Sequence, residues 1–177
     1  MDRILVGVDG SWGSREAVRY AADLAKSTGS RLIIATVVYF HKAFGAPELE
    51  MQVEVWEEEE RERCDRLLGK MARALRRRGV DVETLVLSGR PAEALCEQSW
   101  AAEVDLVVVG HRGRRGLRRV LPGSVAVRLL QICSKPVMVV GPRPAHGWRK
   151  QHPNGGKGQK RGAPALQLVG SPEPARR

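Results

Sequence analysis

The sequence predicts an α/β protein with a single five-stranded parallel sheet and helices on both of its faces. Short continuous apolar runs alternate with helix-length segments throughout residues 1–142, and this alternation is typical of βαβ units. Because the apolar runs are continuous, the strands are expected to be buried on both faces. Hydrophobic residues make up 42% of the chain but aromatic residues only 5%, so we expect an aliphatic, alanine-rich core.

The first two strands flank one helix. Residues 4–8 are a short apolar run that predicts a buried strand, and residues 9–11, Asp-Gly-Ser, predict a turn. Ser14 is a plausible N-cap for the helix that follows, whose apolar residues recur at helical spacing until Gly29 ends it. Residues 32–38 predict the second buried strand.

A long charged helix is expected next. Residues 39–50 contain glycine and proline and predict a loop, which could cover a ligand. The long helix is expected to run from about residue 49 to residue 78. Gly69 weakens helix propensity near its middle, and Gly79 ends it. Acidic residues come early and basic residues late, which suits the helix dipole, so we interpret both runs as solvent-exposed structure.

The remaining elements repeat the strand–helix order. Residues 80–87 predict the third strand, and a helix follows from Pro91 to about Ala101, with proline suited to its first turn. Residues 106–109 predict the fourth strand, residues 123–133 the last helix and residues 136–140 the fifth strand.

The periodicity ends after residue 142, where we place a domain boundary. Residues 143–177 are rich in proline, glycine, glutamine and basic residues and predict a disordered tail. The tail holds eight Lys or Arg and one acidic residue, so it carries +7 of the net +10, and residues 1–142 carry +3. Charge alone supports salt-sensitive, non-specific binding of polyanions by this tail, although Trp148 is its sole aromatic residue.

Composition points to a cytoplasmic setting. No apolar stretch approaches the roughly 20 residues of a membrane span, and the first residues lack the zones of a signal peptide. The three cysteines are scattered and form no C-x-x-C pair, so neither a disulfide framework nor a zinc site is favoured.

The strongest functional pattern is a glycine-rich junction between a strand and a helix. The fourth strand ends at Gly110, Gly113 follows after two residues, and Gly123-Ser124 open the last helix after nine more. Glycines let the backbone approach a ligand closely, and helix N-termini leave N–H groups free for an anion. The spacing matches neither a P-loop nor a dinucleotide-binding motif. An ordinary loop whose glycines serve turns is the competing interpretation.

Other candidate residues follow neighbouring strands. Asp9, Val37 and Gly110 all lie at predicted strand carboxyl ends, where open α/β sheets bind their ligands. Asp9 alone is as well explained by a turn or an N-cap. Arg112 lies inside the glycine-rich junction, and we favour a role for it in attracting phosphate.

The G-x-x-G-x9-G-S pattern resembles the nucleotide signature of the universal stress protein family, in its ATP-binding branch. Residues 4–11, 105–110 and 134–140 are similar to the first, fourth and closing strands of that family. The resemblance covers residues 1–142 and implies a Rossmann-like sheet of order 3-2-1-4-5. It also implies a homodimer formed through the fifth strand, namely Val137, Met138, Val139 and Val140.

The resemblance also implies residue roles. One group of residues would border the adenosine, and the second strand would contact the adenine through its backbone. A second group of residues would hold the phosphates. The adenosine group is Gly7, Val8, Asp9, Val37, Val109 and Gly110. The phosphate group is Gly113, Gly123, Ser124 and Val125. Ala126 departs from a position that often carries a hydroxyl.

The sequence therefore predicts a regulatory module that binds ATP, with Mg²⁺, and hydrolyses it little or not at all. We identify no general base, arginine finger or second substrate pocket, and no protein residue is assigned to a metal. Three alternatives stay open: a module that binds cyclic AMP, a slow ATPase, and nucleic-acid binding through the basic tail.

Overall fold

The structure, a computed structural model, describes residues 1–39, 47–111 and 123–141, with the backbone alone over residues 47–55. Its elements alternate along the chain as expected. In chain order they are β1 (Arg3–Gly7), α1 (Trp12–Thr28), β2 (Arg31–Val38), α2 (Pro47–Arg77), β3 (Val82–Ser88), α3 (Pro91–Ala101), β4 (Leu106–Gly110), α4 (Ser124–Ile132) and β5 (Val137–Val140).

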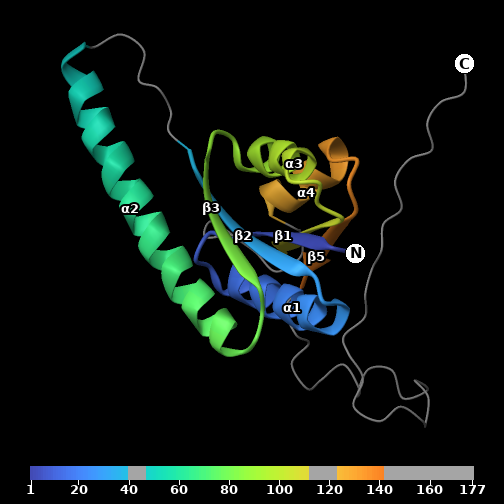
Figure 1. The fold of residues 1–177 in the computed structure, drawn as a ribbon. Coiled ribbons are helices and arrows are strands. Elements are labelled where there is room, and N and C mark those ends of the chain that lie inside the picture. Colours follow the sequence, from blue (N-terminus) through green and yellow to red (C-terminus); the bar gives the residue numbers. More distant parts are fainter. Residues whose placement is uncertain (40–46, 112–122, 142–177) are drawn as a thin grey trace, which may run out of the picture.

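The five strands form one sheet of order β3-β2-β1-β4-β5, and all neighbouring pairs are parallel (Figure 1). The predicted fold class is therefore confirmed. In the middle of the sheet, Val6 of β1 lies opposite Ile34 of β2 and Val108 of β4. This shared register brings the carboxyl ends of the strands to one edge of the sheet, where a ligand site is expected.

Helices cover both faces, α1 and α2 on one side and α3 and α4 on the other (Figure 1). Successive residues of β1 alternate between the two layers, because side chains of a strand point to opposite faces. Ile4 and Val6 pack under α1 and α2, whereas Leu5 packs under α3 and α4. Among the described residues, every buried hydrophobic side chain is aliphatic or a cysteine, which confirms the expected aliphatic core.

Helix α1 begins earlier than expected. The prediction that Ser14 is the N-cap is wrong: Ser11 caps the helix, and its Oγ accepts the Ser14 N–H at 3.1 Å. The Asp9 carboxylate accepts the Ser11 N–H at 3.0 Å and thereby shapes the turn that puts Ser11 in the capping position. At the other end, Gly29 ends the helix with φ of 71°, a conformation that suits glycine.

Helix α2 also begins earlier, at Pro47, so the last residues of the expected 39–50 loop are helical. Proline suits the first turn of a helix because its missing N–H would have no helical partner there. The helix continues through Gly69 without interruption. Arg61 lies level with the end of β3, since its Nη2 is 3.5 Å from Ser88 Oγ. The part of α2 before Arg61 therefore projects beyond the carboxyl edge of the sheet (Figure 1).

The third strand begins two residues later than expected. Val80 lies in the turn that closes the C-terminal end of α2, where its N–H donates to Leu75 O at 3.2 Å, and β3 starts at Val82. Within the described ranges, no helix is both long and apolar enough to cross a bilayer. The predicted disordered tail lies outside the described residues.

Candidate functional site

The structure brings several of the predicted site residues together at the carboxyl edge of the sheet. Val6 of β1 lies opposite Val108 of β4, so the next residues, Gly7 and Val109, are also neighbours. A Cβ placed on Gly7 would lie 3.3 Å from Val109 Cγ1. Val37 is the penultimate residue of β2 and packs in the same layer as Val109, under α3 and α4. The candidate site thus opens toward this layer.

Gly7 has a packing role in this layer. A Cβ on Gly7 would lie 2.8 Å from Leu95 Cδ1, closer than side chains pack in proteins. Leu95 belongs to α3 and is only 2% exposed, so glycine at this position lets α3 lie directly on the end of β1.

Gly110 has a stronger packing role. A Cβ there would lie 2.5 Å from the carbonyl carbon of Gly13, 2.7 Å from its oxygen and 2.9 Å from Ser14 N. All three atoms belong to the backbone of the first turn of α1. The absence of a side chain at Gly110 is therefore required for the contact between β4 and α1, whether or not a ligand is present. This contact was not predicted from the sequence, because it joins Gly110 to Gly13, two residues far apart in the chain.

The start of α4 is the feature best suited to hold an anion. Its N-cap is Gly123, in an extended conformation with φ of −62° and without a side chain to cap the helix. Helix geometry leaves the N–H groups of Ser124, Val125 and Ala126 without carbonyl partners inside the helix. These groups, together with the helix dipole, favour a negatively charged ligand.

The backbone of His111 positions this helix start. The His111 N–H donates to Val140 O at 2.7 Å, and the Gly123 N–H donates to His111 O at 2.6 Å. These two bonds place the beginning of α4 beside the ends of β4 and β5. Since the Gly123 N–H is already paired, the donors left for an anion are those of the three following residues. This role of the His111 backbone was not predicted from the sequence, because it depends on hydrogen bonds with Gly123 and Val140.

Two further predicted residues contribute mainly to structure. Val8 is 5% exposed and packs under α1 and α2, and its N–H donates to Ala35 O at 2.7 Å. Its side chain thus lies in the layer opposite the candidate site. Asp9 accepts the Ser11 N–H, so the turn role anticipated as an alternative is confirmed for this carboxylate. Arg112 and Gly113 lie outside the described residues.

An ion pair joins the helices that frame the site. Arg128 of α4 donates from Nε to Glu93 Oε1 of α3 at 3.1 Å. The pKa of Glu93 is lowered, first by a hydrogen bond with its own backbone N–H and then by Arg128. The described residues include no group of three His, Cys, Asp or Glu side chains that could hold a metal ion.

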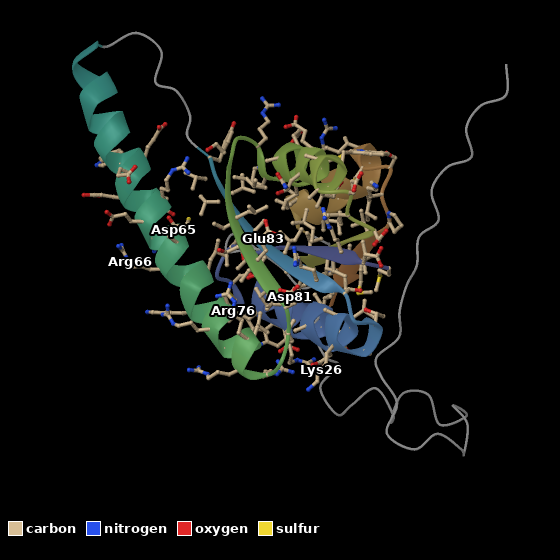
Figure 2. All side chains as sticks on the ribbon, viewed as in Figure 1. Lys26, Asp65, Arg66, Arg76, Asp81 and Glu83 are labelled. Carbon is tan, nitrogen blue, oxygen red and sulfur yellow. The ribbon has the colours of Figure 1, made fainter. Side chains whose placement is uncertain are left out.

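The opposite edge of the sheet carries a shallow hollow between the end of α1 and the start of β3, lined in part by Lys26, Ser30 and Asp81. Figure 2 shows Lys26 and Asp81 close to this end of the domain. Their polar groups are already paired: Asp81 accepts from Arg31 Nε at 2.8 Å, and Lys26 Nζ donates to Arg78 O at 3.3 Å. The hollow is thus a structural junction, far from the strand carboxyl ends.

The fold and the uncapped helix at the strand carboxyl ends define a Rossmann-like protein with a candidate anion site. The sequence profile of the Universal stress protein family matches residues 1–141, and the chain belongs to this family. It is 33% identical over 138 residues to Universal stress protein MJ0531 of Methanocaldococcus jannaschii, an alignment covering 78% of this chain and 81% of the relative.

Solved structures agree with the fold. Universal stress protein UspA of Lactobacillus plantarum superimposes with a TM-score of 0.72 at 22% identity, over 78% of this chain and 97% of that one. A universal stress protein in complex with cAMP has a TM-score of 0.59 at 24% identity, over 78% and 96%. An Arabidopsis thaliana family protein with AMP bound has a TM-score of 0.57 at 18% identity, over 81% and 94%.

Proposed function

We propose that this protein is a regulatory module that binds an adenine nucleotide, ATP with Mg²⁺, at the carboxyl edge of its sheet. The observation that carries the proposal is the start of α4, which has a glycine N-cap, no capping side chain and three backbone amides without carbonyl partners inside the helix, beside the ends of β4 and β5. Family members described as complexes with cAMP and AMP support an adenine nucleotide as the ligand class.

The geometry suggests how the ligand would lie. The phosphates would accept hydrogen bonds from the Ser124, Val125 and Ala126 amides, with Gly113 and Arg112 as further predicted contacts. The adenosine would cross the strand ends toward β2. It would contact Gly7, Asp9, Val37, Val109 and Gly110, and Val8 only through its backbone. Magnesium would neutralise phosphate charge, and the phosphates would supply most of its ligands.

We also propose that the protein acts by binding rather than by turnover. Among the predicted site residues that the structure describes, none is placed as a general base, so hydrolysis is expected well below the roughly 10 s⁻¹ that is typical of enzymes. The setting that fits such a module is the cytoplasm.

The proposed assembly is a homodimer through β5. This strand is an edge of the sheet, and the four residues Val137–Val140 are all apolar. Val127 and Leu130 of the neighbouring α4 are 39% and 41% exposed. An apolar edge strand exposes unpaired backbone groups that a second copy can pair with.

Cyclic AMP is the second candidate ligand, favoured by the cAMP complex of a structural neighbour. It has one phosphate, so it needs fewer contacts at the start of α4 than ATP does. Calorimetric titration of the full-length protein with ATP, ADP and cyclic AMP, each with and without Mg²⁺, separates the candidates.

The sharpest test of the site is Gly123→Asp. Aspartate is a favourable N-cap, and the extended backbone at Gly123 accommodates it, so the variant is expected to fold at least as well as the wild type. Its carboxylate would occupy the anion position and repel phosphate. We expect nucleotide binding to fall at least tenfold. Gln131→Glu, which adds the same charge near the other end of α4, serves as the matched control.

The two variants give distinct outcomes. Loss of binding in Gly123→Asp with retention in Gln131→Glu supports phosphate at the start of α4. Equal affinities in both folded variants would place the phosphates elsewhere. If no adenine nucleotide at millimolar concentration raises the Tm of the wild type, the proposed function itself is refuted, because bound ligand must stabilise the folded state.

A further inference from the structure

Two cysteines meet where the end of α4 lies beside α3, away from the candidate nucleotide site. Cys96 belongs to α3, and its Sγ donates to Ile132 O at 3.7 Å; Ile132 is the residue directly before Cys133, the C-cap of α4. Ser99 lies between the two cysteines. Its Oγ donates to Cys96 O at 2.6 Å and is 3.6 Å from Cys133 Sγ.

The hydrogen bonds show where the thiol protons lie. Because the Ser99 hydroxyl proton points to Cys96 O, Ser99 Oγ acts as the acceptor toward Cys133, and the Cys133 thiol is the donor. The Cys96 thiol donates to Ile132 O. Burial, followed by the hydrogen bond and charge of the Cys133 thiol, raises the pKa of Cys96 to about 11. Cys96 is therefore a weak first nucleophile at neutral pH.

We propose that Cys96 and Cys133 form an intramolecular disulfide when the protein is exposed to a hydroperoxide. Both side chains are partly exposed, so a small peroxide can reach them. The two thiols lie close together: Cys96 Sγ is 3.7 Å from the carbonyl oxygen of Ile132, the residue before Cys133, and Cys133 Sγ is 3.6 Å from Ser99 Oγ, which itself donates to Cys96 O.

The reaction balances with hydrogen peroxide as the oxidant. The Cys133 sulfur attacks one peroxide oxygen, the O–O bond breaks, and Cys133 sulfenic acid and one water form. The Cys96 sulfur then attacks the sulfenic sulfur, the S–O bond breaks, and the disulfide and a second water form. Two thiol hydrogens leave in the two waters, and the peroxide is reduced. Cys96 attacks second in this order because its raised pKa makes it a weak first nucleophile.

The disulfide would not depend on nucleotide binding. Cys133 lies at the opposite end of α4 from Gly123, and a nine-residue helix is about 14 Å long. The third cysteine, Cys64, is 8% exposed and belongs to α2 on the other face of the sheet. It provides a matched control because it is free but has no cysteine neighbour among the described residues.

The test uses the full-length chain treated with hydrogen peroxide, digested with trypsin and analysed by mass spectrometry without reduction. The wild type and Cys64→Ser are expected to yield a linked pair of peptides containing Cys96 and Cys133, lighter by two hydrogens than the separate peptides. The oxidised protein should have a higher Tm, because the bridge restricts the unfolded chain, and dithiothreitol should reverse the increase. The rate should rise with pH, because the thiolate is the form that attacks peroxide.

The order of attack is tested by trapping sulfenic acid with a 1,3-dione. Label is expected on Cys133 in Cys96→Ser, and at least several-fold less on Cys96 in Cys133→Ser. Disulfides between molecules, disulfides that include Cys64, or oxidation that stops at sulfinic acid in the wild type would each overturn the proposal. The wild-type result decides the matter even if a serine variant fails to fold, and none of these outcomes bears on nucleotide binding.

Discussion

Gly110→Ala tests whether the first glycine of the G-x-x-G pattern serves packing. In the wild type the added Cβ would lie 2.5 Å from Gly13 C, 2.7 Å from Gly13 O and 2.9 Å from Ser14 N. Ordinary van der Waals contacts lie at about 3.5–4.0 Å, so α1 must retreat by roughly 1 Å from the end of β4. The opposing atoms belong to the helix backbone and cannot rotate away.

The expected cost follows from this geometry. Overpacking a well-packed core by one methyl group typically costs 1–3 kcal/mol, and a clash with backbone belongs to the upper part of that range. Replacing glycine with alanine also restricts the unfolded chain, which raises the free energy of unfolding by about 0.4–1 kcal/mol. Gly110 has no positive φ, so no further backbone strain arises. We expect a net loss of about 2 kcal/mol, or roughly 6–10 °C in Tm.

Urea unfolding and thermal melts of the variant without ligand provide the measurement. Gly7→Ala is the comparison, because its Cβ meets the end of the Leu95 side chain at 2.8 Å. That side chain can shift, so we expect a smaller loss of about 1 kcal/mol. If Gly110→Ala is as stable as the wild type, or less affected than Gly7→Ala, the packing explanation of Gly110 is wrong.

Three other predictions use different regions of the molecule. Gly69→Ala should stabilise the protein by about 0.5–1 kcal/mol in urea unfolding, because its Cβ meets only the flexible end of Arg73 at 3.5 Å; a loss would mean that α2 needs the glycine. Asp105→Ala should cost less than about 1 kcal/mol at pH 7. Backbone hydrogen bonds from Asp2 and Arg3 lower the pKa of Asp105, so its contribution is fully present above the usual aspartate value of about 3.9. The difference from the wild type should shrink as the pH falls through the lowered pKa; a difference that grows on acidification would contradict this. Truncation after residue 142 should preserve ATP titration and remove most salt-sensitive DNA retention, since the tail carries +7; loss of ATP binding would place the tail in the site.

The strand order and the layers could be predicted because buried parallel strands leave a strong pattern. Residues 32–38 and 106–109 are continuous apolar runs bounded by turns, and both became strands within one residue of the expected bounds. Gly29 and Gly123 marked a helix end and a helix start in the same way. These signals are local, so one sequence suffices to detect them.

The first residues of helices and strands were harder to predict, because neighbouring residues compete for the same capping position or hydrogen bond. Ser11 and Ser14 are both suitable caps, and the Asp9 carboxylate decides between them by holding the Ser11 N–H. Val80 fits a strand pattern, but its N–H closes the end of α2 instead. The preference of a single residue for a cap or a strand cannot predict these element starts, since each start depends on the position of a hydrogen-bonding partner elsewhere in the chain.

The glycine pattern shows why the role of each residue in a candidate binding signature can be predicted only in part from the sequence. Gly110 is needed to let α1 touch β4, whereas the extended backbone at Gly123 is open to any residue. The pattern thus combines one glycine required by the fold with another whose missing side chain leaves a helix N-terminus uncapped. Substitution separates them: Gly110→Ala should reduce stability in the absence of nucleotide, and Gly123→Asp should reduce binding while stability is kept. If both variants lost stability and binding together, the requirement of the fold for glycine and the requirement of the ligand for glycine could not be separated. The uncapped start of α4 would then have to be explained by packing alone.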